Sequence, residues 1–497
     1  MSRFDDIQQA LDAVSPVPAD LPKLYLLGDT GAGKTTIIRK LLGTEDSKFP
    51  TTRQIRTTVA FTEYIIHNSD TYDVAVVLKP LTEVEEYINE ILKEAISRFQ
   101  KDRDQDKIIK NLRQTSDQRF RLYFLLSPEF SEQIKNRIID LSPLVDQKVA
   151  EYQHEFPEDE PGLFVDFALT DLGDSYTSIC SAIIEEVQRK AKLVCNGDGL
   201  ESSWKVHTYS DDEKVRFIAK CKELLSSEVN SISPLIDYAR IRGNLAAPWL
   251  SAGTEVVIVD SEGNSHDTKE AGQFPSRHYD YFYRADAILL IEKSKEAFIS
   301  GGGKGALKSI FERGYGEKLL VLFTKLDEVE PYDTEDPTND DRVEEVRDGL
   351  TNVLSSLKKE GQDIDLSENG IFYLGGLKKE GMDSDAISQI NAVLARAREL
   401  STFKQSFVRP EYDFEMLSAF LMESTKKFNE LYKGMLDNQH WQTIKAFNLR
   451  MKMMGIEEGF RMFMPITDFE NTITVKDQGI SPDPGPRQIP TSAALRW

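Results

Sequence analysis

A glycine-rich stretch near the N-terminus holds the residues with the clearest capacity for chemistry. Residues 21–42 read LPKLYLLGDTGAGKTTIIRKLL, in which an apolar run ends at Gly28 and a lysine and two threonines lead into a second apolar run. The order of strand, turn and helix, with the spacing G-x-x-x-x-G-K-T, is the P-loop pattern. Its glycines permit positive φ angles that bring backbone N–H groups close to an anion, and the helix adds its N-terminal dipole. We therefore predict that this stretch binds a nucleoside triphosphate.

Two side chains in this stretch have distinct expected roles. Lys34 can reach the β- and γ-phosphates, and the hydroxyl of Thr35 is placed to bind Mg²⁺. A second ligand for the ion is expected at Asp260, which ends an apolar strand predicted over residues 254–259. Gly263 follows three residues later, where its backbone N–H can contact the γ-phosphate. Because ligands of open α/β sheets bind at the carboxyl ends of the strands, we expect these groups at one edge.

A second motif, TKLD at 324–327, bears on which base is bound. It follows an apolar strand predicted over residues 318–323. The Asp327 carboxylate can accept hydrogen bonds from N1–H and the amino group of guanine, whereas adenine offers neither donor and would leave the carboxylate unpaired. The stem of Lys325 can lie along the base, and Gly376, after a short predicted strand, can offer its N–H to the guanine carbonyl. The alternative interpretation is an exposed turn that carries ordinary charges.

The sequences GDTGAGKT, DSEG and TKLD together resemble those of the Ras-like class of P-loop GTPases. In the sequence of its glycine-rich loop and in its length, the chain resembles the immunity-related, septin-like and dynamin-like large GTPases. The resemblance covers roughly residues 21–70 and 250–380. It implies GTP and GDP as ligands with Mg²⁺, and hydrolysis of GTP to GDP. The nucleotide contacts that it implies are Gly28, Asp29, Thr30, Gly31, Ala32, Gly33, Lys34, Thr35, Thr36, Thr324, Lys325, Asp327 and Gly376.

The same resemblance implies a switch threonine that closes over Mg²⁺ and the γ-phosphate. Thr58 is favoured because it directly precedes a strand predicted from residue 59; Thr52 is the second choice, and Thr51 and Thr57 are further candidates. The metal ligands are then Thr35, Thr58 and Asp260, and the residues expected to act in hydrolysis are Lys34, Thr58, Gly263 and Asn264. Many relatives have a water-positioning glutamine where this chain has Asn264, whose shorter amide predicts slow hydrolysis until the protein is activated or dimerised.

Three further features leave alternatives open. Arg53 and Arg56 are either charge-neutralising fingers or solvated loop arginines, and His266 is either a water-orienting or a solvated histidine. Some relatives hold a catalytic potassium ion through an asparagine at the position of Gly31, so potassium is not supported here. The functional hypotheses that follow are a GTPase that switches or assembles with its nucleotide state, a non-catalytic GTP-binding module and, if residues 324–327 do not recognise guanine, a protein that uses ATP.

The elements that must position these groups alternate between strands and helices, which predicts an α/β fold with a doubly wound, mostly parallel sheet. The expected divisions are an N-terminal helix (1–20), a GTPase domain (21–74 and 246–384), a mostly helical insertion with its own core (75–245), a C-terminal helical region (385–474) and a flexible tail (475–497). Strands over 59–67 and 72–78 are expected to pair as a hairpin, and the glycine run at 301–305 is expected to be a flexible connection.

The composition of the chain indicates its cellular environment and disfavours some classes of partner. The chain has 497 residues, and its net charge of −22 disfavours nucleic acid and anionic lipid as partners. Its three cysteines form no C-x-x-C pair, which fits a reducing cytosol, and no window is apolar enough to span a membrane. Without a basic amphipathic helix, direct membrane binding is not expected. The helical parts are expected to engage a protein partner or a second copy of the chain.

Overall fold

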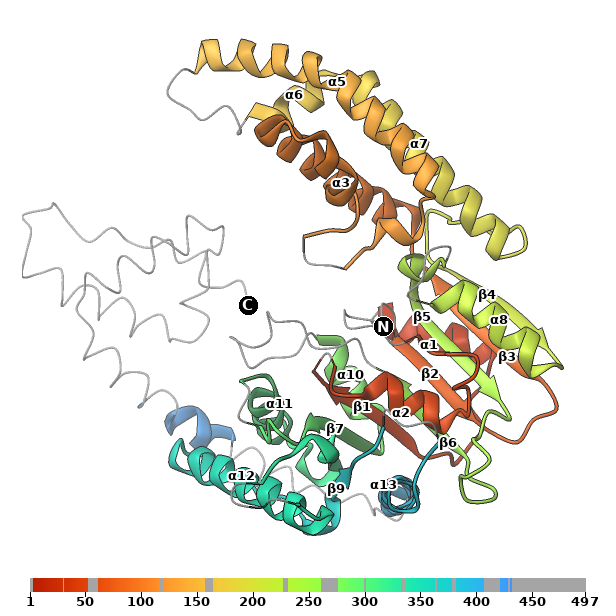
Figure 1. Ribbon diagram of the computed structural model, residues 1–497, viewed down its shortest axis with the longest axis vertical. Coiled ribbons are helices and arrows are strands. Elements are labelled where there is room, and N and C mark those ends of the chain that lie inside the picture. Colours follow the sequence, from red (N-terminus) through yellow and green to blue (C-terminus); the bar gives the residue numbers. More distant parts are fainter. Residues whose placement is uncertain are drawn as a thin grey trace, which may run out of the picture. The chain divides into compact units, whose positions relative to one another are not determined.

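The computed structural model describes residues 3–405, apart from gaps at 30, 52–60, 117–118, 157–163, 227–230, 261–275, 299–300, 332–333, 335, 363 and 378–380, together with residues 421–427 and 430. Contacts divide the chain into two compact units, Met1–Ser406 and Phe407–Trp497. All elements labelled in Figure 1 belong to the first unit. The helices expected between 406 and 474 fall outside the described part of the chain, except for the helical residues 421–427, and so does the tail from residue 475.

Within the described residues, nine strands form one sheet, in the order β4-β3-β5-β2-β6-β1-β7-β8-β9 (Figure 1). Short apolar runs rich in β-branched residues favour such strands, as in the sequence VVIVD of β6. The strands are β1 (Lys23–Gly28), β2 (Phe61–Ile66), β3 (Tyr72–Leu78), β4 (Lys205–Asp211), β5 (Ile236–Gly243), β6 (Val256–Asp260), β7 (Ala287–Lys293), β8 (Leu319–Thr324) and β9 (Ile371–Leu374).

Most neighbouring strands run parallel. The pairings β6–β1, β1–β7, β7–β8, β8–β9 and β2–β5 are parallel, whereas β2–β6, β3–β5 and β3–β4 are antiparallel. The predicted α/β class with a parallel-rich sheet is therefore confirmed.

The predicted hairpin between β2 and β3 is wrong. β5 lies between these two strands and pairs with both of them, so they are not neighbours. A turn signal between two apolar runs cannot exclude a third strand that arrives from far along the chain. β5 also brings Arg240, which is 1% exposed and whose Nε donates to the Glu63 carboxylate of β2 at 2.6 Å. This buried ion pair joins β2 to β5, and β3 has no cationic side chain that could replace it.

Helices cover both faces of the sheet. Because side chains alternate along each strand, a strand contributes apolar side chains to a cluster on each face. On β1, Leu24 and Leu26 belong to one apolar cluster, and Tyr25 and Leu27 belong to the other. The first cluster also contains residues of α2 (Lys34–Leu41), α8 (Lys214–Leu225) and α13 (Ser384–Gln405). The second contains residues of α1 (Arg3–Val14), α10 (Ser276–Arg284), α11 (Gly301–Glu312) and α12 (Asn339–Lys359).

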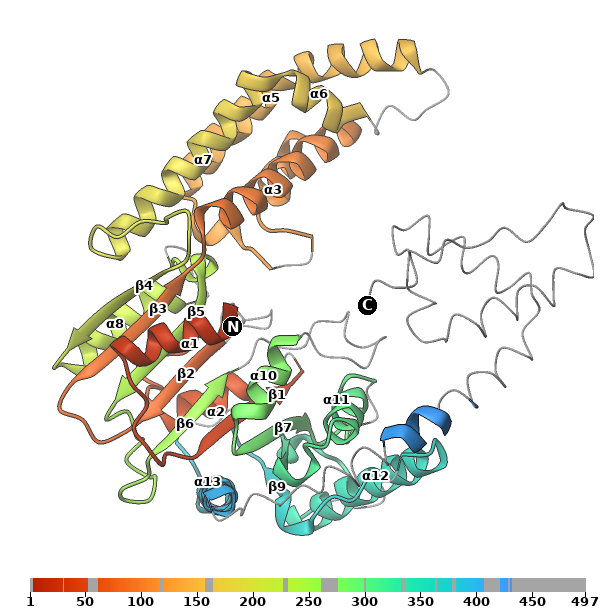
Figure 2. The same ribbon diagram turned by 180° about the vertical axis from the view of Figure 1, so that it is seen from behind.

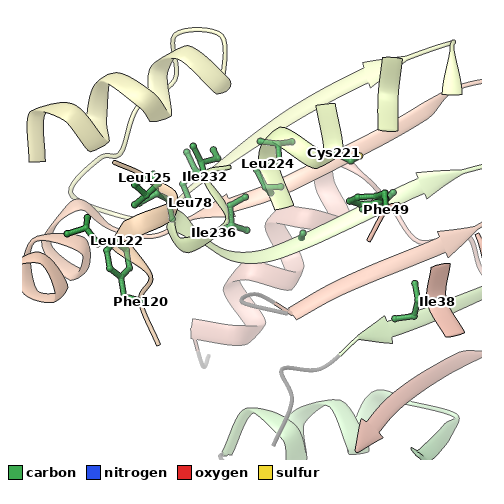
Figure 3. Close-up of a cluster of buried hydrophobic side chains, with 14 of the residues drawn as sticks. Ile38, Phe49, Leu78, Phe120, Leu122, Leu125, Cys221, Leu224, Ile232 and Ile236 are labelled. Carbon is green, nitrogen blue, oxygen red and sulfur yellow. The ribbon is translucent and has the colours of Figure 1, made fainter. Parts of the chain in front are cut away.

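A set of helices follows β3 and packs together before the chain returns to the sheet at β4 (Figure 2). It comprises α3 (Leu81–Asp102), α4 (Ile108–Asn111), α5 (Pro128–Glu155), α6 (Val165–Asp171) and α7 (Gly173–Val194). The sequence predicts that these helices have a core of their own. In the described residues, apolar side chains of these helices and of the sheet instead belong to one cluster. Figure 3 shows the junction, where Leu122 and Leu125 share this cluster with Leu78 and Ile236. Two strands of the sheet, β4 and β5, also come from residues within the range 75–245.

The glycine run at 301–305 is helical, so its interpretation as a flexible connection is wrong. Gly301 begins α11, and the run forms its first turn. Glycine is a poor helix former in isolation, which is why the sequence pattern favoured a loop. The helix forms because its later residues Ala306, Leu307 and Ile310 are buried in the second apolar cluster.

Candidate nucleotide-binding site

The carboxyl ends of neighbouring parallel strands bring the predicted motifs to one edge of the sheet. β1 ends at Gly28, β6 at Asp260 and β8 at Thr324, and β7 pairs with both β1 and β8. β9 ends at Leu374, directly before the segment 375–377. The strand order therefore collects segments that are distant in the sequence along a single edge (Figure 1).

The phosphate loop (residues 28–36) has the positive φ angles that its glycines predicted. Gly28, Gly31 and Gly33 adopt φ angles of 152°, 81° and 109°, a region that side chains disfavour. Lys34 begins α2 and is 6% exposed, and its Nζ donates a hydrogen bond to the carbonyl of Gly28. The lysine thus reaches back to the first residue of the loop, so its charge lies within the segment predicted to bind phosphates.

Backbone hydrogen bonds link further described residues of this loop. Ala32 is buried, and its N–H donates to the carbonyl of Asp29 at 3.1 Å. The N–H of Ile37 donates to the carbonyl of Gly33 at 2.9 Å and so continues α2 from the loop. Thr35 and Thr36 are partly buried in the first turn of α2. Of the predicted contacts in the loop, Thr30 lies outside the described residues.

Gly28→Ala is expected to weaken nucleotide binding and to lower the melting temperature. A Cβ on residue 28 would lie 2.3 Å from the backbone oxygen of Ile291, which the β1–β7 pairing holds in place. The φ angle of 152° adds strain for any side chain. Because the loop must shift to relieve this contact, we expect an affinity for GTP at least about tenfold lower in calorimetry.

The matched control for this substitution is Gly31→Ala. Residue 31 has a φ of 81°, yet nothing lies within 4 Å of an added Cβ. Only the backbone strain applies there, at a cost of about 1 kcal/mol. Equal losses of affinity in the two variants would show that the close approach of β1 and β7 is unimportant for binding.

The segment 324–327, which is predicted to recognise the base, is joined directly to the phosphate loop. Thr324 is fully buried, and its Oγ1 donates to the carbonyl of Ala32 at 2.6 Å. A Cβ on Gly33 would lie 3.7 Å from Cγ2 of Thr324 and 3.5 Å from Cδ1 of Leu377. The phosphate loop, the end of β8 and the segment after β9 therefore meet around the backbone of Gly33.

Asp327 lies in a short turn beside the predicted Gly376. The turn spans Leu326–Glu328 and is preceded by Lys325, whose φ is 57°. The Asp327 side chain is exposed, and its Oδ1 accepts a hydrogen bond from the N–H of Gly376 at 2.7 Å. This bond orients the carboxylate from the segment whose Leu377 would be in contact with a side chain at position 33 of the phosphate loop. The arrangement suits a ligand that has an anionic end and a base with paired N–H donors.

The two predicted magnesium ligands that the structure describes have the oxygen chemistry that this ion prefers. Asp260 is 1% exposed, in register with Leu26 of β1, and Thr35 is partly buried. Burial raises the pKa of Tyr64 on β2 well above its usual value, and the charge of Asp260 raises it further. Within the described residues, no group of three or more His, Cys, Asp or Glu side chains is arranged to hold a metal ion.

The segments expected to sense the γ-phosphate fall outside the described residues. This applies to the two favoured switch threonines, to the D-x-x-G glycine, to the residue after it and to the arginine and histidine candidates: Thr52, Thr58, Gly263, Asn264, Arg53, Arg56 and His266. Thr51, the last described residue before the first of these segments, is buried.

Two buried residues at the end of β7 lie beside the predicted site but are not among the residues that the sequence predicts for it. Ser294 is 3% exposed, and both its N–H and its Oγ donate to the carbonyl of Thr324 at 2.8 Å. Glu292 is 2% exposed and lies directly beyond Ile291, the partner of Gly28 in the β1–β7 pairing. The available signal was the run AILLIEKS, in which polar residues follow an apolar strand as they do after β6 and β8.

Comparisons with known proteins assign no family. No protein-family model matches the chain, and no curated protein matches it. Two solved structures, both of an oligomerised bacterial dynamin pair described as sensing and tethering membranes over long range, are similar at 11% and 12% sequence identity. They cover 92% and 91% of this chain, with TM-scores of 0.33 and 0.30. This chain spans half the length of each of those two.

Proposed function

We propose that this chain binds GTP and GDP with Mg²⁺ and hydrolyses GTP to GDP, acting as a nucleotide-controlled switch or an assembling large GTPase. The observation that carries the proposal is the hydrogen bond from Thr324 Oγ1 to the carbonyl of Ala32. It joins the base-recognition motif to the phosphate loop across a sequence separation of 292 residues. Such a bond fits a single ligand that spans both segments, and an exposed turn with ordinary charges has no need of it.

Recognition of guanine is proposed for the Asp327 carboxylate. N1–H and the amino group of guanine are two donors for one carboxylate, and adenine presents neither. Gly376 already holds this carboxylate through its N–H, so the acceptor is oriented before the base arrives. Lys325 is partly exposed next to it, where its stem can cover the base.

Phosphate binding is proposed for residues 28–36, and hydrolysis for the groups around the γ-phosphate. Lys34 supplies the positive charge within the loop, and the backbone N–H groups of the loop and of α2 supply donors. Magnesium, when bound through Thr35, Asp260 and the switch threonine Thr58, supplies charge neutralisation at the phosphates. Gly263 and Asn264 are proposed to contact the γ-phosphate and the attacking water.

The proposed switch is coupled to the fold through α10. The segment that contains Gly263 connects β6 to α10, and the first residues of α10 include His278, which is 4% exposed. Nδ1 of His278 is hydrogen-bonded to the hydroxyl of Tyr25 on β1 at 2.7 Å. Because β1 leads directly into the phosphate loop, α10 is joined to the strand that positions the nucleotide. Release of the γ-phosphate is therefore expected to act on α10.

A partner surface is proposed on the helical parts of the chain, within the ranges 75–245 and 385–474. Phe156 at the end of α5 and Phe167 on α6 are 52% and 59% exposed, which is unusual for large aromatic side chains. A protein partner or a second copy would bury them. Among the helices that the structure describes, none is both long and apolar enough to cross a membrane.

Calorimetry and turnover test the proposal together. GTP and GDP are expected to bind with at least about 100-fold higher affinity than ATP, because adenine cannot satisfy the carboxylate. Turnover per molecule is expected to rise with protein concentration if assembly activates the enzyme. Asn264 favours a second candidate, a GTP-binding module without catalysis, in which GTP binds but phosphate release stays at the uncatalysed rate at every concentration. Equal affinity for GTP and ATP contradicts both candidates.

A further inference from the structure

Two carboxyl groups lie next to each other at the junction of β1, β7 and α11. Gly28 on β1 is in register with Ile291 on β7, so the residues that follow, Asp29 and Glu292, occupy neighbouring positions. Alternation along β7 directs Glu292 to the face covered by α11, the same face as Leu290. Glu292 is 2% exposed, and Asp29 is the second residue of the phosphate loop.

The glycine turn at the start of α11 fits these two carboxyl groups. A Cβ on Gly302 would lie 2.7 Å and 2.9 Å from the carboxylate oxygens of Asp29, and a Cβ on Gly303 would lie 2.3 Å from Oε2 of Glu292. Any larger residue at either position would displace a carboxyl group. The two glycines therefore allow α11 to close over the pair at the side of the phosphate loop.

The surroundings of Glu292 disfavour its ionised form. Burial, and after it the negative charges of Asp29 and Glu296, raise its pKa to about 8, and Lys293 opposes the shift. Lys293 is itself paired with Glu296 at 2.7 Å. The first turn of α11 presents glycines and Lys304, whose Nζ is paired with the end of α12. Near neutral pH, these surroundings therefore favour the protonated form of Glu292.

We propose that Glu292 is a positioning residue for the phosphate loop, which acts through Asp29 and holds the loop in its binding shape only while it carries a proton. The inference rests on the proposed nucleotide site, since nucleotide affinity is its main readout. The carbonyl of Asp29 accepts the hydrogen bond from Ala32, so a displacement of Asp29 moves the loop itself. When Glu292 ionises, the two carboxylates repel each other in a confined space, and the new charge also opposes the phosphates.

The same proton links the stability of the fold to pH. The pKa of Glu292 is raised from 4.5 to about 8 in the folded chain, so the folded state keeps a proton that the unfolded state releases. The contribution to stability is complete below about pH 4.5 and is lost as the pH rises through about 8. Nucleotide affinity is expected to fall over the upper part of this window.

The test measures GTP affinity of the full-length wild-type protein and of E292Q between about pH 6.5 and about pH 8.8 by calorimetry. Glutamine keeps the shape of the protonated acid and cannot ionise. The wild-type affinity is expected to fall by about threefold more than that of E292Q, because only the wild type gains a charge beside the loop. The difference between the two proteins cancels the pH dependence of the nucleotide. E312Q alters an exposed carboxylate at the far end of α11, which does not act on the pKa of Glu292, and as the matched control it should follow the wild type.

D29N provides an independent check. Removal of the neighbouring charge lowers the pKa of Glu292, so the fall in affinity is expected at lower pH than in the wild type. Identical pH profiles of the wild type and E292Q, or an unmoved midpoint in D29N, would overturn the proposal, and D29N alone decides if E292Q does not fold. If neither the wild type nor any variant binds nucleotide at any pH, the proposed function is wrong and the nucleotide measurements do not bear on Glu292. Glu292 is then tested by melting temperature, and the wild type must lose more stability than E292Q as the pH rises.

Discussion

Lys34→Ala is expected to lower the affinity for GTP by about 100-fold, equivalent to about 2.7 kcal/mol. Lys34 is 6% exposed, and its Nζ donates a hydrogen bond to the carbonyl of Gly28, inside the loop that is proposed to bind the phosphates. The substitution removes the only cationic side chain in residues 28–36, so the triphosphate loses the one side-chain charge that this loop offers. ATP, GTP and GDP should all lose affinity, because their phosphates are alike. Calorimetry with each nucleotide measures the effect.

The control for this substitution is Lys295→Ala, which removes the same charge from an exposed position after β7. It should leave the affinity within about twofold of the wild type, since an exposed charge is screened by solvent and salt. Thermal unfolding of both variants separates lost binding from lost folding. GTP affinity retained in a folded Lys34→Ala protein would refute the assignment of residues 28–36 as a phosphate site.

The local geometry of the phosphate loop could be predicted from the sequence because it depends on neighbouring residues. Glycines at 28, 31 and 33 take positive φ angles that few other residues accept, and Lys34 follows at a fixed distance along the chain. The approach of Thr324 to Ala32 could also be expected, since both follow apolar strands and parallel strands end at the same edge.

The features that the sequence did not reveal depend on contacts between distant segments. β5 separates β2 from β3, and nothing in either strand indicates that Arg240 arrives from β5 to pair with Glu63. The glycine run that begins α11 has the composition of a loop, and its fit to the carboxyl groups of Asp29 and Glu292 depends on segments that are distant in the sequence. A helix in which glycines accommodate two carboxyl groups has no local pattern of its own.

Asp327→Asn is expected to lower the affinity for GTP by about 100-fold and to raise the affinity for xanthosine triphosphate. The asparagine oxygen can still accept the N–H of Gly376, a bond that is 2.7 Å long with the carboxylate, so the turn should keep its shape. The new amide N–H₂ then faces the amino group of guanine, and two donors meet with no acceptor. Xanthine has a carbonyl at that position, which the amide can satisfy. Competition between the two nucleotides, measured in both proteins, gives the change in preference.

This change in preference separates base recognition from support of the loop. If the segment 324–327 only braced the phosphate loop through Thr324, Asp327→Asn would weaken GTP and xanthosine triphosphate equally, as Lys34→Ala is expected to do. Asp340→Asn, an exposed substitution in the first turn of α12, should change neither affinity by more than about twofold. In the double variant of Lys34 and Asp327, the two losses for GTP should add in free energy, because one side chain is proposed to contact the phosphates and the other the base. A strong departure from additivity would indicate that both substitutions disrupt one shared structure, in which case Asp327 is not the residue that recognises guanine.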